Sequence, residues 1–188
     1  IDTAKNMLVS GCHTTQIPDD VVEIGCVAFA STEKLEEITI PDSVKKIEWN
    51  AFKYCKNLQH VRFPKHLEYI GEGAFGYCNG LKEITIPVSV TVIGDNAFHE
   101  CYNLTDVYYG GNRSQWNAIE MGAGEALSGV KFHFSAVGCE HIPGKSEVVD
   151  EWGGNSCLDT KYQRVVTYCA DCGSTIEEKH VPIPPKGH

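Results

Sequence analysis

The sequence lacks the features that mark most enzymes, membrane proteins and nucleic-acid-binding proteins. None of its apolar runs approaches the roughly 20 residues that a membrane-spanning helix requires. It contains no G-x-S-x-G nucleophile motif, no H-E-x-x-H zinc motif and no phosphate-binding loop. Basic residues are few, 16 against 25 acidic ones, and the net charge is −9, which argues against nucleic acid as a partner. We therefore expect a protein that is not an enzyme, does not span a membrane and does not bind nucleic acid.

What the sequence does contain is a repeat. Residues 35–55, 58–78 and 81–101 superimpose at a fixed offset of 23 residues and share the frame L-x-x-[IV]-x-[IF]-P-x-x-[VL]-x-x-I-x-x-x-A-F-x-x-C. Residues 12–34 are a further copy with substitutions, and residues 104–109 start another. A period in the twenties is typical of a solenoid, in which each repeat is one small unit that stacks on the next.

The apolar positions of one repeat predict its local structure. Ile38 and Ile40 alternate with polar residues, as in a short strand with one buried face. Pro41 has no N–H to offer a neighbouring strand, so the strand ends there. Ile47 marks a second extended segment. Residues 51–55 carry apolar side chains at i, i+1 and i+4, the spacing of a single helical turn with one buried side.

We therefore expect a β-rich (α+β) fold for residues 1–134: a right-handed solenoid of leucine-rich-repeat type with parallel strands and short helical turns. Residues 110–134 abandon the frame and are expected to close the stack. Residues 1–11 show no signal peptide and no recognisable cap, so we expect a fragment of a longer array. Residues 135–188 have no repeat frame and predict a small cysteine-rich β-hairpin module. The repeats are expected to start near residues 12, 35, 58, 81 and 104.

Nine cysteines fall into two populations. Those of the solenoid include three at the last position of the frame, where cysteine is expected to be buried as a small apolar side chain: Cys55, Cys78 and Cys101. Cys12 replaces the repeat leucine and is expected in the core as well. Cys26 has no counterpart in the frame, and we interpret it as an exposed thiol.

The second population lies in the module of residues 135–188. Cys139 and His141 form one pair and the Cys169-x-x-Cys172 motif forms another, which together suit tetrahedral zinc. Cys157 could replace one of these four ligands. A structural zinc ion is one expectation for this module. Disulfide bonds, natural in an exported protein, are a second, and free thiols are a third.

The frame resembles the BspA-like class of leucine-rich repeats, also found in treponemal surface proteins, through its I-P-x-S-V-x-x-I and A-F-x-x-C segments. Residues 104–134 resemble the closing module of such proteins from Gram-positive gut bacteria. The resemblance covers residues 12–134. It implies a secreted or wall-attached protein at the cell surface, an adhesin or host-contact molecule that binds a host or bacterial surface protein or glycan. It implies no single ligand.

Outward strand positions form a polar column that could bind such a partner. Arginine and tyrosine are preferred at binding hot spots, so we predict a site at Arg62 and Tyr108 with His60 and Glu83. Trp49 and Tyr54 mark a possible second patch. Three alternatives stay open: a merely solvated sheet, a structural spacer, and an ancillary binding domain of a larger surface enzyme.

Overall fold

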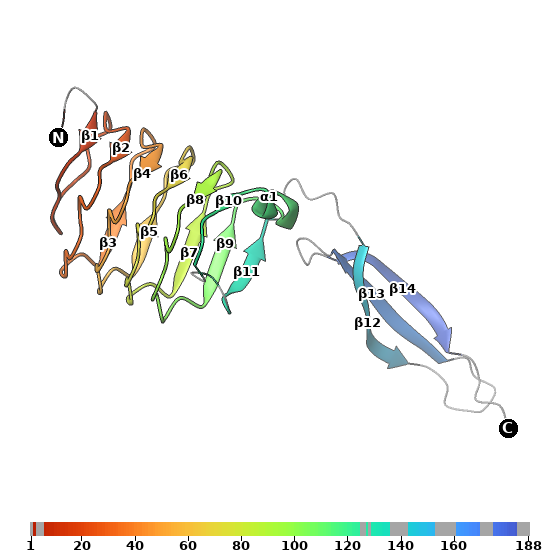
Figure 1. Cartoon of the computed structure of the whole chain (residues 1–188). Coiled ribbons are helices and arrows are strands. Elements are labelled where there is room, and N and C mark those ends of the chain that lie inside the picture. The colour runs from red at the N-terminus through yellow and green to blue at the C-terminus, as the bar shows by residue number, and fades with distance from the viewer. Residues whose placement is uncertain are drawn as a thin grey trace.

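The repeats wind into a solenoid in which successive coils add strands to two sides of the stack (Figure 1). This computed structural model describes residues 2, 6–124, 127, 129–135, 143–152, 161–169 and 175–183. One side is a six-stranded parallel sheet in the order β1 (Met7–Leu8), β2 (Glu23–Ile24), β4 (Lys46–Ile47), β6 (Tyr69–Ile70), β8 (Val92–Ile93) and β10 (Glu120–Met121).

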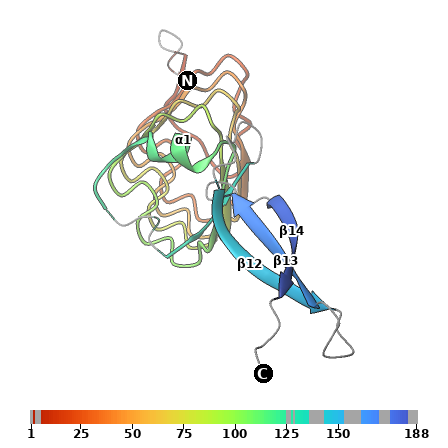
Figure 2. The ribbon, with the colours of Figure 1, turned by 90° about the vertical axis from the view of Figure 1, so that its right-hand side faces the viewer.

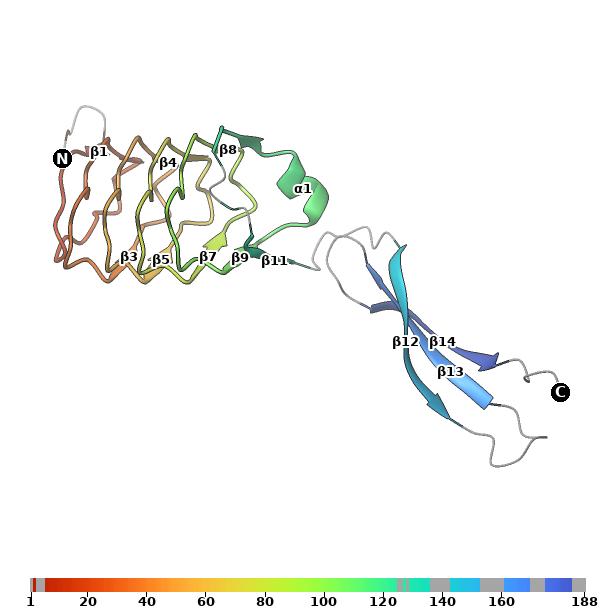
Figure 3. The ribbon, with the colours of Figure 1, turned by 60° about the horizontal axis from the view of Figure 1, so that its bottom comes forward.

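The other side carries the longer strands, which we call the strand face (Figure 3). Its parallel pairs follow the 23-residue offset, with Ile38 opposite Val61 and Ile84 opposite Val107. The strand positions predicted to be buried therefore stack into one apolar column of Ile38, Val61, Ile84 and Val107, in which Val61 is only partly buried. The strands are β3 (Glu37–Thr39), β5 (His60–Arg62), β7 (Glu83–Ile86), β9 (Asp106–Tyr109) and β11 (Lys131–Phe134).

A column of phenylalanine rings runs through the core, as the frame predicted. Phe29, Phe52, Phe75 and Phe98 are each almost fully buried. Their rings stack in sequence, with centroids 5.0, 5.0 and 5.5 Å apart and planes within 7° of parallel. The view along the stack shows successive coils overlaid in one outline (Figure 2). The two inner rings, Phe52 and Phe75, therefore each lie between the rings of the two neighbouring coils.

The segments that carry these rings are not helical, contrary to our expectation. We call residues 48–55, 71–78 and 94–101 the turn segments. Within one of them, alternate amides donate to the carbonyl three residues earlier, as from Lys53 to Asn50. The intervening amides donate to the next coil, as from Phe52 to Ala74. Apolar spacing at i, i+1 and i+4 is compatible with both arrangements, so the burial was predicted correctly and the helix was not.

The cysteines of the solenoid differ in exposure. Cys55 and Cys78 are fully buried, as expected, whereas Cys101 is only partly buried. Cys26 is exposed, also as expected. The prediction for Cys12 was wrong, because its side chain is exposed. Cys12 lies in the outermost described coil, where no other described coil packs against its outer side.

The end of the solenoid is closed by a modified coil. The helix α1 (Arg113–Asn117) begins with a capping box between Asn112 and Gln115. It buries Trp116, whose ring packs edge-on against Tyr109 at 5.1 Å. After the helix, β10 pairs with β8 and β11 pairs with β9, so both sides of the stack gain one more strand.

The described residues beyond the solenoid form an antiparallel sheet of their own. It has three strands in the order β12 (Pro143–Trp152), β13 (Lys161–Cys169) and β14 (Thr175–Ile183). This is one strand more than the predicted hairpin. The register places Pro143 opposite Cys169 at one end and Trp152 opposite Tyr162 at the other.

Candidate functional site

The strand face presents two outward rows of side chains across β3, β5, β7, β9 and β11. The parallel register sets Glu83 beside Asp106 and Lys131 in one row, and Thr85 beside Tyr108 and His133 in the other. β5 lies next to β7 and contributes His60 to the first row and Arg62 to the second. Side chains on alternate strand positions point to one face, so both rows lie on the same surface.

The four predicted binding residues all lie on this face. His60, Arg62 and Glu83 are exposed, and Tyr108 is 39% exposed. Neighbouring strands are about 4.8 Å apart, so Arg62 and Tyr108, two strands apart in one row, are separated by about 10 Å. Within the described part of the chain, no hydrogen bond or ion pair joins the four to one another. They are neighbours on one surface, not a connected network.

The structure adds His133, which sequence reasoning missed. Its ring stacks on that of Tyr108, with centroids 4.4 Å apart and planes 13° from parallel. Its Nε2 lies 2.7 Å from Asp106 Oδ1. The hydrogen bond with His133, helped by one from Thr105, lowers the pKa of Asp106. The alternation of residues 130–134 carried the signal, because pairing that strand with 106–109 places His133 beside Tyr108.

The second predicted patch is reorganised. Trp49 and Tyr54 are both exposed, by 47% and 40%. Among the described residues, however, Tyr54 stacks on Tyr77 of the next coil, at 4.7 Å, and not on Trp49. Tyr77 in turn meets the edge of His99, at 5.7 Å. The aromatic patch therefore runs along the three turn segments. We call the side of the solenoid that these segments form the turn side.

The predicted metal ligands cannot be assembled from the described residues. Cys139, His141, Cys157 and Cys172 lie outside them, and of Cys169 only the backbone is described. Inside the described ranges, no group of three or more His, Cys, Asp or Glu side chains is arranged to hold a metal ion. The ligand set therefore stays a prediction.

In the part of the chain that the structure describes, no helix has both the length and the apolar character to cross a membrane.

Comparisons with known proteins identify the repeat. The chain matches the family model for the BspA type leucine rich repeat region, in six copies over residues 9–118. A solved leucine rich cell surface protein from Faecalibacterium prausnitzii is 32% identical over 62% of this chain and 36% of its own, with a TM-score of 0.52. The chain thus spans about a third of that relative. A search of curated proteins found no significant match.

Two further solved structures are similar. A leucine-rich repeat protein from Bacteroides capillosus is 45% identical over 48% of this chain and 64% of its own, with a TM-score of 0.45. The pneumococcal vaccine antigen PcpA is 21% identical over 70% of this chain and 34% of its own, with a TM-score of 0.58, and shows likeness of fold alone. Since the family model covers more than half of its residues, the chain belongs to the BspA-type leucine-rich repeat family.

Proposed function

We propose that this chain is a binding module without catalytic activity, and that its strand face recognises a protein at the cell surface. The observation that carries the proposal is the ring stack of the exposed Tyr108 on the half-buried His133, in one row with Arg62. Tyrosine and arginine dominate binding hot spots. Here they stand on paired strands, whose backbone is held in place by the ladder, so little conformational entropy is lost on binding.

The face fits a protein better than a small molecule. It is an open array of side chains from five strands, whereas small-molecule sites are concave and enclose their ligand. An extracellular, adhesin-like role is part of the proposal. It is supported by the relative from Faecalibacterium prausnitzii, which is described as a cell surface protein. A structural spacer is the competing function, and it predicts no dependence of binding on this face.

The test is a binding screen with purified host extracellular-matrix proteins, followed by a double variant, Arg62→Ala with Tyr108→Ala. For a protein bound by the parent, we expect the dissociation constant to rise by at least about tenfold, the equivalent of ~1.4 kcal/mol. The thermal unfolding midpoint should hardly change, because both side chains point away from the core.

The matched control is Lys56→Ala with Tyr102→Ala, which also removes one cation and one exposed tyrosine but from outside the strand face. This control should bind like the parent. If the Arg62/Tyr108 variant binds as tightly as the control, the strand face is only a scaffold.

A further inference from the structure

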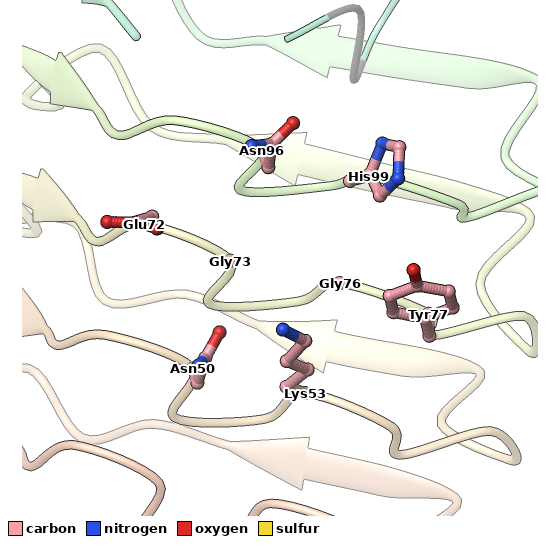
Figure 4. A pocket seen from close by; sticks show the side chains of 8 residues that line it. All are labelled: Asn50, Lys53, Glu72, Gly73, Gly76, Tyr77, Asn96 and His99. Carbon is pink, nitrogen blue, oxygen red and sulfur yellow. The ribbon is translucent and has the colours of Figure 1, made fainter. Parts of the chain in front are cut away.

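The turn side of the solenoid holds a hollow that the strand face does not explain. It has a volume of about 140 Å³ and is lined by three successive turn segments (Figure 4). The middle segment presents Gly73 and Gly76 to it. The positions 23 residues earlier and later all carry side chains: Asn50, Lys53, Asn96 and His99. The two glycines therefore leave bare backbone as a floor, and the neighbouring coils supply the walls.

The two glycines differ in what requires them. Gly73 has a φ of +59°, a positive value like those of Asn50 and Asn96, and a Cβ at position 73 would force the Asn50 carboxamide to move, so glycine is the residue that fits here without adjustment. Gly76 has no positive φ. A Cβ there would lie 3.3 Å from the carbonyl oxygen of Gly73 and 3.7 Å from Lys53 Cγ. The equivalent positions hold Ala30, Lys53 and His99, so the fold accepts a side chain where Gly76 leaves a space.

Asn50 supplies a polar group to the hollow. Its side chain is 7% exposed, lines the hollow, and makes no hydrogen bond to any residue that the structure describes. Figure 4 shows its carboxamide directed toward Gly73, across the floor. In the described part of the chain, the fully buried side-chain polar atoms without a partner belong to other residues, so the Asn50 amide is open to the hollow and to water there. A bound ligand with hydroxyl groups would supply both a donor and an acceptor.

One end of the hollow is an aromatic wall. Tyr77 forms it, backed by the stacked ring of Tyr54 and met edge-on by His99. The Lys53 ammonium lies 5.5 Å from the centre of the Tyr54 ring and 6.0 Å from that of Tyr77. These contacts from both neighbouring coils hold Tyr77 in place. The wall therefore offers an apolar edge together with a phenol hydroxyl, the amphipathic character that tyrosine brings to binding sites.

The charges around the hollow favour a neutral ligand. Lys53 contributes one positive charge and Glu72 one negative charge, so the two balance. At the edge of the hollow, His99 Nε2 lies 3.4 Å from Glu100 Oε1. The chain as a whole carries a net charge of −9, which repels anions.

We propose that this hollow binds a neutral sugar residue of a glycan. A hexose ring has several hydroxyl groups that both donate and accept hydrogen bonds, and apolar C–H groups between them. The hydroxyl groups suit the amide, ammonium and carboxylate groups of Asn50, Lys53 and Glu72. The C–H groups suit the apolar ring edge that Tyr77 offers to the hollow. This site lies apart from the strand face and does not depend on the protein partner proposed for that face.

The experiment uses the whole chain and four probes, the methyl glycosides of glucose, galactose, mannose and N-acetylglucosamine, in saturation-transfer NMR. We expect at least one glycoside to bind the parent. Gly76→Gln should fill the hollow and weaken that binding by at least about tenfold. Gly76→Ala adds only the Cβ and should retain most of the affinity. The pair separates occupation of the hollow from any effect on the backbone.

A second variant keeps the test decisive if Gly76→Gln proves unstable. His99→Ala removes one wall and places there the residue found at the equivalent Ala30, so the fold should persist while glycoside binding weakens. The strand-face variant of Arg62 and Tyr108 should bind the glycoside like the parent. Binding of none of the four glycosides would overturn the proposal, as would equal binding by parent, Gly76→Gln and His99→Ala. Neither result would bear on the strand face.

Discussion

The thiol of Cys78 donates a hydrogen bond to the backbone carbonyl of Phe52, 3.2 Å away and one coil earlier. Cys55 and Cys101 make the same bond to Phe29 and Phe75, both at 3.1 Å. The repeat cysteine therefore does more than fill apolar space. It ties the end of each turn segment to the preceding coil through a polar contact that alanine could not make.

Burial and hydrogen bonding should give the thiols very different reactivity. Hydrogen bonds from Thr14 and then Thr15 lower the pKa of the exposed Cys12 to about 7. Burial raises the pKa of Cys55 to about 11 and that of Cys101 to about 12. Because the thiolate is the nucleophile, iodoacetamide at neutral pH should modify Cys12 in the folded protein long before either buried cysteine.

Mass spectrometry of timed samples checks this order, and the rate at Cys12 should rise between about pH 6 and pH 8, around its pKa. Unfolding the chain in denaturant should remove the protection of the buried thiols. Labelling of Cys78 as fast as Cys12 under native conditions would contradict the buried ladder.

The phenylalanine column should make the middle of the stack the most sensitive to truncation. Phe75 contacts Phe52 and Phe98 by stacking and Phe63 edge-on at 5.5 Å. Phe75→Ala should lower the free energy of unfolding by about 3–5 kcal/mol. Phe29→Ala should cost less, because Phe29 stacks on a ring on one side only among the described residues. Denaturant unfolding of both variants provides the comparison, and an equal or smaller loss for Phe75→Ala would count against the column.

The repeat frame predicted the strands and the buried apolar positions because similar residue types recur every 23 positions and must stack. It did not predict the backbone of the turn segments. Asn50 and Tyr54 have φ values of 53° and 64°, and such left-handed residues interrupt a helix. The recurrence of Asn or Gly at 50, 73 and 96 carried this signal, since these residues adopt positive φ most readily.

The candidate sites were harder to predict than the fold. His133 comes from the modified closing coil, where the frame no longer assigns a register. The hollow exists because position 76 is glycine, whereas the equivalent positions in the two neighbouring coils, Lys53 and His99, carry side chains. It becomes visible only when these three positions are compared together with the residues around them. Both sites arise where the sequence departs from its own repeat.

The pairing of His133 with Asp106 should be visible as a pKa. Replacing His133 with alanine removes the main hydrogen bond that lowers the pKa of Asp106, while the one from Thr105 Oγ1, at 2.8 Å, remains. The pKa of Asp106 should then rise toward its ordinary value, as measured by an NMR titration of the carboxyl carbon. His60→Ala, which removes a histidine from β5 on the same face, is the control.

A lowered carboxyl pKa in the folded state stabilises the fold at pH values above the unfolded pKa, and this stabilisation is lost as the pH falls through the folded pKa. The advantage of the parent over His133→Ala in thermal unfolding should therefore shrink in acid. An unchanged pKa of Asp106 in the variant would show that the contact with His133 does not form in solution.

The cysteines and histidine of residues 135–188 give the last prediction, which tests zinc against disulfides. If a zinc ion is held by Cys139, His141, Cys169 and Cys172, these four ligands complete one tetrahedral structural site. Purified protein should then contain about one zinc ion per chain. A chelator should unfold the sheet of β12, β13 and β14 and leave the solenoid transition in place, because metal binding supplies folding energy only locally. Cys172→Ser should abolish zinc binding, whereas Cys157→Ser should retain it. Elemental analysis without zinc, together with a mass that shows these cysteines paired, would assign the module to disulfides instead.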